Sequence, residues 1–491
     1  MSIGEQIIAS CKRLLFFLAC LTIDAQKLWS GKQLTKKNKN QIFICVIAAL
    51  LFIGLVLGIY AAAGSHAPWE HSFYDSFTLQ AMAWRKGEAK LSQNYPYLEL
   101  AIVNKEYFAN HSMDDYEAYR EKFGDINAPI EDQEGNEYYV SFPPFPSVPM
   151  FLLSFFFGED TPSTMMSILY TAGAFLFAIL IGRRLQYSYT VSIVGAAFLC
   201  IASSALFICT NKMAGGVWFQ AQALALLLTT GAFYFILGGR DRDYYTACIL
   251  LACAVGCRPF QLIYFIPCAY IMAKQYDFKI LKTWKFYVAP AIIGGIYMWY
   301  NYIRFGNPLE FGHNYLPEFM RMPDGQFGWA YFGQNFANAF GEIPHFTAEG
   351  LSFNQFGFAF YIANVIFILA VVSMVFRIGI PSRRPSSRLR TRLTDSYTPE
   401  MWILIACITA HLLFLLLHKT LGGWQFGSRY TVDMAPATLV LIELAVQPLF
   451  VTHRKGQKPP GKKLRLAFSI IAGILLVFGG ILNLYGAVKM F

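Results

Sequence analysis

Long apolar runs separated by short polar stretches dominate the chain. A bilayer-spanning helix needs about 20 mainly apolar residues, because the hydrocarbon core is about 30 Å thick. The run from Gln41 to Tyr60 meets this requirement, whereas Leu14 to Ile23 is too short and is predicted to form part of an interfacial helix. In all, the pattern predicts eleven spans, at about 41–60, 164–182, 191–209, 218–237, 244–256, 260–273, 286–302, 356–376, 402–417, 432–451 and 467–485.

The basic residues predict how these spans are oriented. Residues 1–40 carry seven Lys or Arg and two acidic residues, so we expect them in the cytoplasm, with the transmembrane domain over 41–491. With eleven crossings, the strongly basic loops all fall on the same side and the C-terminus lies outside. Two long loops, 62–160 and 304–355, then face outward. No separate soluble domain is expected.

Composition agrees with a polytopic, all-α membrane protein. Hydrophobic residues make up 56% of the 491 residues and charged residues 14%, whereas a soluble domain carries roughly 25% charged residues. The net charge of +10 does not indicate nucleic-acid binding, because segment 62–144 has 14 acidic and 6 basic residues and the positive charge is concentrated in the inner loops. The ten cysteines show no disulfide framework and no zinc-type spacing.

The first outer loop contains two segments predicted to be helical. DSFTLQAMAWRKG, which begins at Asp75, places apolar residues near helical spacing. The aromatic and Pro-rich stretch that follows Tyr138 leads into an apolar run, Val148 to Phe157, too short to span easily. We expect this run to form a helix lying on the outer membrane surface, since prolines are tolerated in a first helical turn.

Charged residues gather at the predicted outer ends of the spans rather than inside them. They are Asp75, Lys212, Arg258, Arg304, Lys419 and Arg429. A secondary transporter would place its polar site near the membrane midplane. One carboxylate facing several cations instead suits group transfer from an anionic lipid: the carboxylate accepts a proton from an acceptor hydroxyl, and the cations stabilise a departing phosphate.

Four stretches in this order resemble polyprenyl-phosphate-dependent glycosyltransferases of the GT-C fold, related to protein O-mannosyltransferases and lipid A aminoarabinose transferases. They are HSFYDSFTLQAMAWRKG after the first span, EYYVSFPPFPSVPM, RFGNPLEFGHNY and GGWQFGSRYTVDMAP. The resemblance implies a GT-C fold and a polyprenyl-phosphate sugar donor. It also implies an acidic base in the first outer loop and basic residues that bind the lipid phosphate.

Each candidate residue also has a structural alternative. Asp75 is the predicted base, with Glu70 second, but an Asp before a helical run is also a common N-cap. Arg258, Arg429, Lys212 and Arg304 are the predicted phosphate ligands; the alternative is snorkelling or headgroup contact. Predicted sugar or acceptor contacts are Trp69, Tyr74, Trp424 and His313, although Trp is common at membrane interfaces.

His66, Glu70 and His71 could bind a metal ion, but a plain surface turn is the favoured interpretation of these three residues. No cofactor is therefore expected. His411 and Glu443 lie inside spans and could form an intramembrane pair.

The sequence thus predicts an inverting membrane glycosyltransferase in a bacterial plasma membrane, acting on the outer face. Its expected partners are a polyprenyl-phosphate-linked sugar, membrane lipid, and a glycan, lipid or protein acceptor. A transporter or flippase for a lipid-linked sugar is the first alternative, because it would use the same basic groups. A non-catalytic scaffold in envelope assembly is the second.

Overall fold

A computed structural model describes residues 36–64, 68–95, 97–104, 135–316, 324–348, 350–354, 356–380, 396–419, 421–423, 425–451 and 461–489. The predicted interfacial helix at 14–23 lies outside these residues. The chain divides into two units, Met1–Leu55 and Val56–Phe491, and everything below concerns the second unless stated otherwise.

Helices account for most of the described chain. The first, α3 (Lys36–Ala63), passes from the first unit into the second. The other helices of at least ten residues are α4 (Ser76–Arg85), α7 (Ser147–Phe157), α8 (Ser163–Arg184), α9 (Tyr189–Cys200), α11 (Val217–Ile236), α12 (Asp241–Val255), α13 (Phe265–Gln275), α14 (Val288–Phe305), α16 (Phe332–Gly341), α18 (Ile366–Gly379), α20 (Pro399–Leu417), α21 (Ala435–Phe450) and α22 (Lys462–Lys489).

Each of the eleven predicted spans coincides with a helical segment. Six helical stretches among the described residues are long and apolar enough to cross a membrane: 40–63, 163–184, 217–236, 399–417, 429–450 and 462–489. Two shorter apolar helices, α9 and α18, accompany them. The protein is therefore a mainly helical, multi-pass membrane protein, and the total of eleven crossings stays a prediction.

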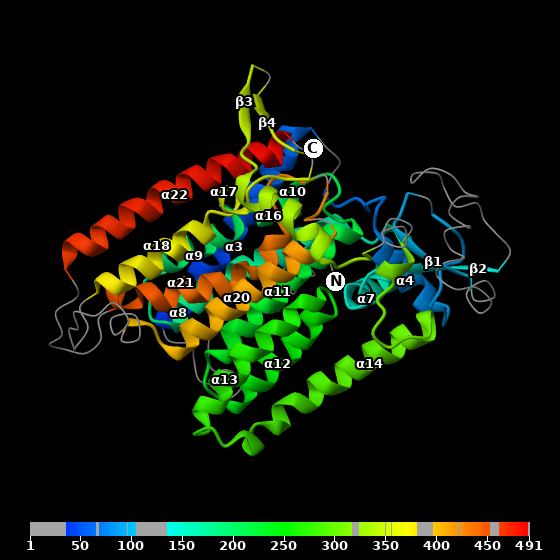
Figure 1. Ribbon diagram of the computed structural model, residues 1–491, viewed down its shortest axis with the longest axis horizontal. Helices are drawn as coiled ribbons and strands as arrows, with labels where there is room; N and C mark the ends of the chain where they lie inside the picture. Colours follow the sequence, from blue (N-terminus) through cyan, green and yellow to red (C-terminus); the bar gives the residue numbers. More distant parts are fainter. Residues whose placement is uncertain are drawn as a thin grey trace. The chain divides into compact units, whose positions relative to one another are not determined.

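Helix α11 is central to the packing. It lies against α8 on one side and α12 on another, and it also contacts α21 (Figure 1). Most of its residues are buried, which explains why its sequence is apolar around the whole helix rather than along one stripe. Helix α21 packs in turn against α18 and α20. These contacts bring the start of α11 near the start of α21.

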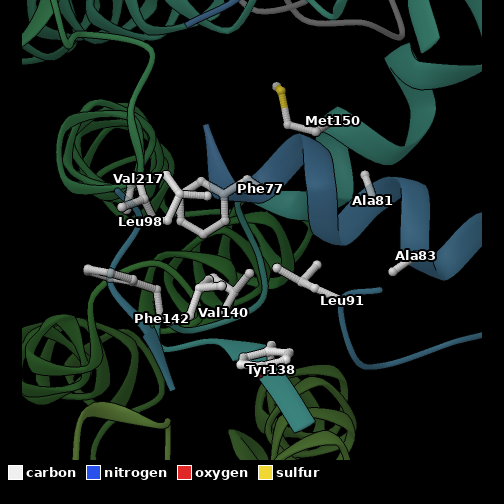
Figure 2. Close-up of a cluster of buried hydrophobic side chains, with 12 residues drawn as sticks. Phe77, Ala81, Ala83, Leu91, Leu98, Tyr138, Val140, Phe142, Met150 and Val217 are labelled. Carbon is white, nitrogen blue, oxygen red and sulfur yellow. The ribbon is translucent and has the colours of Figure 1, made fainter. Parts of the chain in front are cut away.

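The predicted first outer loop folds into a small substructure of its own. Helices α4 and α7 pack together beside an antiparallel pair, β1 (Leu100–Asn104) and β2 (Asn136–Val140). Figure 2 shows Phe77, Val140 and Phe142 converging in the buried cluster between these elements, with Val217 of α11 at its edge. Both helices predicted in this loop are present. The cluster attaches the loop to the membrane helices.

Two spans predicted as continuous are interrupted, and one side chain connects the interruptions. The predicted span 191–209 is split into α9 and α10 (Ala205–Thr210), and the one at 356–376 into α17 (Phe360–Ala363) and α18. Asn364 lies at the second break; its Oδ1 accepts a hydrogen bond from the Ser204 N–H at the first, 2.7 Å away. Its Nδ2 donates to Thr431 Oγ1 (3.0 Å) and, at 3.3 Å, to the Ser428 carbonyl.

A second hairpin belongs to the predicted second outer loop. Strands β3 (His345–Thr347) and β4 (Gly350–Ser352) pair antiparallel and project away from the helices (Figure 1). Phe346 in this hairpin is 90% exposed.

Candidate functional site

Asp75 caps α4, as the structural alternative for this residue predicted. Its Oδ1 accepts hydrogen bonds from the N–H groups of Phe77 (3.0 Å) and Thr78 (3.1 Å). Its Oδ2 accepts one from the Thr78 hydroxyl at 2.5 Å. Asp75 is 1% exposed, so the carboxylate is buried.

One imidazole lies near this carboxylate. His71 Nδ1 is 3.8 Å from Asp75 Oδ2. Burial raises the pKa of the Asp75 carboxyl, while His71 and the hydrogen bonds from Thr78 act in the opposite direction. Asp75 forms no hydrogen bond or ion pair with Arg258 or Arg429 in the described chain.

The Pro-Pro stretch, Phe142 to Phe145, is attached to the end of α12. The Phe145 N–H donates to the Gly256 carbonyl at 3.0 Å. A Cβ added to Gly256 would lie 2.3 Å from the Tyr297 hydroxyl and 2.8 Å from the Phe145 Cβ. Only a glycine lets these three segments meet here, two residues before Arg258.

Arg258 is held by an ion pair that joins α12 to α21. Its Nε donates to Asp433 Oδ2 at 2.9 Å, and the two side chains are 16% and 1% exposed. Gln261 strengthens the junction by donating to the Asp433 carbonyl at 3.2 Å. Because Nε is used by Asp433, the terminal nitrogens of Arg258 are the atoms that remain for Tyr430 and for a ligand.

Arg429 packs against the same tyrosine, Tyr430. The guanidinium carbons of Arg258 and Arg429 are 4.7 and 4.8 Å from the Tyr430 ring centroid. Arg429 donates to the Trp218 carbonyl and to Gln222 Oε1, both at 3.1 Å, and is 4% exposed. The structure therefore brings the two predicted arginines together, but it holds Arg429 mainly by protein contacts.

A cavity of about 270 Å³ opens beside Arg258. Its aromatic walls include Phe142, Phe260 and Phe327, and its polar groups are Arg258, Glu310, Asn314, His313, Gln326, His418 and Tyr430. Glu310 is the only acid among the described residues that line it. Its Oε1 accepts from the Gly312 N–H at 2.6 Å and its Oε2 from the Asn314 amide at 2.5 Å, which fixes the carboxylate in place.

His313 lines this cavity as a neutral imidazole. Burial, together with His418 and Arg258 nearby, lowers the pKa of His313 to about 3. Its ring lies 4.9 Å from that of Phe142. At neutral pH the cavity therefore combines one fixed cation, one carboxylate and an uncharged histidine.

An apolar groove of about 430 Å³ is also lined by the Pro-Pro stretch. Pro144 and Phe145 line this groove, whereas Phe142 and Pro143 line the cavity with Arg258. The remaining walls come from α4, α7 and α14, and include Trp84, Val148, Ile296 and Trp299. Four consecutive residues thus separate a polar cavity from a hydrocarbon-like surface.

The other predicted phosphate ligands lie elsewhere. Arg304 is fully buried and donates to the Val140 carbonyl (2.8 Å) and to Asn301 Oδ1 (2.9 Å), so it ties α14 to β2. Lys212 is exposed in the turn before α11. Neither residue is among the described residues lining the cavity.

The remaining candidates divide into surface and site positions. Glu70 and Trp69 are exposed, the latter by 67%. Tyr74 is half-buried, with its ring 5.8 Å from that of Trp218, and its carbonyl accepts from the Val217 N–H. Trp424 and His66 lie outside the described residues. No group of three His, Cys, Asp or Glu side chains within the described ranges is close enough to hold a metal ion.

Asp433, Glu310 and His418 were not selected from the sequence. Glu310 and Asp433 lie within RFGNPLEFGHNY and GGWQFGSRYTVDMAP, and each is the single acid of its motif. A single acid in a motif whose other charged residue is an arginine, Arg304 or Arg429, was the available signal. The ion-pair partner of Asp433 could not be identified from its motif, because Arg258 lies 175 residues away in the sequence.

No protein-family model and no curated protein matches the sequence. Among solved structures, the fold is similar to the apo oligosaccharyltransferase of Archaeoglobus fulgidus, with a TM-score of 0.45 and 11% identity over 91% of this chain and 56% of that one. It is also similar to ArnT from Cupriavidus metallidurans bound to undecaprenyl phosphate, with a TM-score of 0.44 and 10% identity over 92% of this chain and 76% of that one. The chain thus spans a little over half the length of the oligosaccharyltransferase.

Proposed function

We propose that the protein is an inverting membrane glycosyltransferase that moves a sugar from a polyprenyl-phosphate donor to an acceptor hydroxyl on the outer membrane face. The observation that carries this proposal is the pairing of a polar cavity and an apolar groove across Phe142 to Phe145. A polyprenyl-phosphate sugar has the matching chemistry: an anionic, polar head beside a long hydrocarbon chain.

In this reaction the prenyl chain lies in the groove and the phosphate binds the terminal nitrogens of Arg258. The acceptor oxygen loses its proton to a carboxylate and forms a bond to the anomeric carbon. The bond from that carbon to the phosphate oxygen breaks, and the phosphate monoester departs with the electron pair. Arg258 stabilises the negative charge that develops on it. Arg429, packed against the same Tyr430, adds positive potential.

Two carboxylates are candidates for the base, for different reasons. Asp75 is the one implied by the sequence resemblance, and it occupies a cap position with both oxygens hydrogen-bonded. Glu310 is favoured by its place in the cavity with Arg258. A base must come within hydrogen-bond reach of the acceptor hydroxyl, so geometry favours Glu310.

The reaction is tested with purified protein, a synthetic polyprenyl-phosphate sugar and a panel of sugar and lipid alcohols. We expect release of polyprenyl phosphate that depends on protein and acceptor. Arg258→Ala should lower kcat/KM by at least about a hundredfold, since charge-assisted contacts to a leaving phosphate contribute several kcal/mol. Lys90→Ala, which removes an exposed cation paired with Glu137, is the matched control.

Isosteric variants assign the base. If Glu310 is the base, Glu310→Gln abolishes transfer and Asp75→Asn, which retains a good cap, leaves most activity. The opposite result returns the role to Asp75. If the protein moves the donor across vesicle membranes and forms no product, it is a transporter rather than an enzyme. If it neither transfers the sugar nor moves the donor, and cells that lack it still have an envelope defect, the scaffold role is favoured.

A further inference from the structure

A second enclosed space lies among α9, α18, α21 and α22 and shares no described lining residue with the cavity beside Arg258. Its volume is about 280 Å³. The walls are mainly aliphatic and aromatic side chains, among them Val194, Phe198, Leu369, Leu439, Phe468 and Leu476. One carboxyl group, that of Glu443 on α21, interrupts this apolar surface.

Glu443 is 6% exposed, and its two carboxyl oxygens have different surroundings. Oε1 would lie 3.2 Å from a Cβ added to Gly195, so that glycine makes room for it. None of the described residues forms a hydrogen bond with Oε2. The Tyr187 hydroxyl donates to the Glu443 backbone carbonyl and leaves the carboxyl group unsatisfied.

The pairing with His411 that the sequence suggested does not form. His411 Nδ1 is 3.0 Å from the Tyr264 hydroxyl, on the side of α20 that faces Phe260. A buried carboxyl oxygen without a hydrogen-bond donor lowers the stability of the fold, because its hydrogen bonds to water are lost and no protein donor replaces them. Glu443 Oε2 therefore lacks a hydrogen-bond donor, at the edge of a cavity whose walls are mainly apolar.

Access to this space is available from α22. Gly473 and Ser469 line it from that helix, and a Cβ added to Gly473 would meet no atom within 4 Å. Neighbouring Ile470 and Ile474 are 53% and 64% exposed, as expected of a helix face in contact with lipid. A membrane-dissolved molecule can reach the cavity past these glycine and serine positions.

We propose that this cavity binds an aliphatic alcohol from the membrane, with its hydroxyl donating to the Glu443 carboxyl group, which lines the cavity, and its chain against Val194, Leu439 and Leu476. The hydroxyl supplies the missing donor, and the chain matches the walls. The volume accommodates part of such a chain, being just below the usual range of about 300–1,000 Å³ for ligand pockets. The proposal does not depend on the glycosyltransferase function.

The experiment compares 1-dodecanol with 1-methoxydodecane, which has the same chain and no O–H donor. Thermal unfolding of the purified full-length protein in detergent is followed as each probe is added. Dodecanol should raise the midpoint by roughly 2 °C or more, increasing with concentration, and the ether should have a much smaller effect. Equal effects of the two probes, or no effect of either, would overturn the proposal.

Variants test whether the carboxyl is the acceptor. Glu443→Leu should remove the difference between the two probes, whereas Glu443→Gln, whose amide oxygen still accepts, should keep it. Gly473→Leu places a side chain in the cavity from α22 without changing the carboxyl group, and it should also remove the dodecanol effect. This variant keeps the test usable if Glu443→Leu folds poorly. Ser373→Ala, a buried change on α18 whose hydroxyl bonds within its own helix, is the control that keeps it. A dodecanol effect that persists in Glu443→Leu or Gly473→Leu would place binding elsewhere.

Discussion

At the scale of single residues, the Arg258 guanidinium has two tasks, which different atoms perform. Nε joins the end of α12 to the turn before α21 through Asp433, and the terminal nitrogens remain for Tyr430 and for a ligand in the cavity that Arg258 lines. Removing Asp433 leaves a cation in a nearly closed site, and removing Arg258 leaves a buried carboxylate. Stability and activity therefore depend on this pair in different ways.

Asp433→Leu and Arg258→Met should each lower the free energy of unfolding by about 3–5 kcal/mol, because each leaves an uncompensated charge. The double variant should recover most of that loss while staying inactive in transfer. Denaturation in detergent and the transfer assay measure the two effects on the same samples. A double variant as unstable as the sum of the single variants would show that the pair is not coupled.

His313 should make stability pH-dependent. The pKa of His313 is about 3 in the folded protein, against about 6.5 for an unperturbed histidine. When the pH falls below about 6.5, the unfolded chain takes up a proton that the folded protein does not, so stability decreases down to pH 3. Over pH 7 to 4, the unfolding midpoint should therefore drop more in the wild type than in His313→Gln. Parallel curves would contradict this prediction.

Sequence reasoning selected Arg258 and Arg429 because both lie at predicted outer ends of spans, and the family resemblance implies basic phosphate ligands there. It did not identify Asp433 or Glu310 as site residues, because their roles depend on partners brought near by folding. The capping of α4 by Asp75 could be predicted, since a cap is a local structure formed within three residues. What could not be predicted was the enclosure of that carboxylate by the loop and α8.

At the scale of elements, α7 and α14 form walls of the apolar groove, and this gives it a testable role. Val148→Trp or Ile296→Trp places a large ring in the groove without touching Arg258. Each should raise KM about tenfold or more for a long-chain donor and change KM little for a short-chain donor. Losing the burial of about two methylene groups weakens binding by roughly 1.6 kcal/mol, which corresponds to at least a tenfold change. KM values for matched donors of both lengths provide the measurement, and equal increases for both would contradict a chain-binding groove.

Apolar run length predicted the positions of the helices well, because in a membrane each helix satisfies its own backbone hydrogen bonds. The same rule explains the two failures. It assumes that a span stays continuous, whereas Asn364 supplies the Ser204 N–H with an acceptor from another element. A helix can break inside a membrane protein once a distant side chain replaces the intrahelical partner, and the local sequence does not contain that partner.

At the scale of the whole molecule, the distribution of basic loops predicts the topology, with eleven crossings and the C-terminus outside. A cysteine placed at Thr347, in the β3–β4 hairpin, should react with a membrane-impermeant maleimide in intact cells. A cysteine at Asp241, the first residue of α12, should react only after permeabilisation. The background is measured in a chain with Cys11→Ser and Cys20→Ser, since the eight other native cysteines are buried. The reverse pattern would invert the topology.

Asn364 also has a consequence for the order in which the protein is made. Ser204 emerges from the ribosome 160 residues before the side chain that satisfies its N–H. Until then, the stretch from Tyr189 to Thr210 can satisfy its backbone in the membrane only as an unbroken helix. Biogenesis must therefore include a late rearrangement, in which that helix breaks as α17 and the loop before Arg429 arrive. A chain that stops before residue 364 should retain an unbroken helix over Tyr189 to Thr210, and the break should form only after Asn364 and its partners Ser428 and Thr431 have been made.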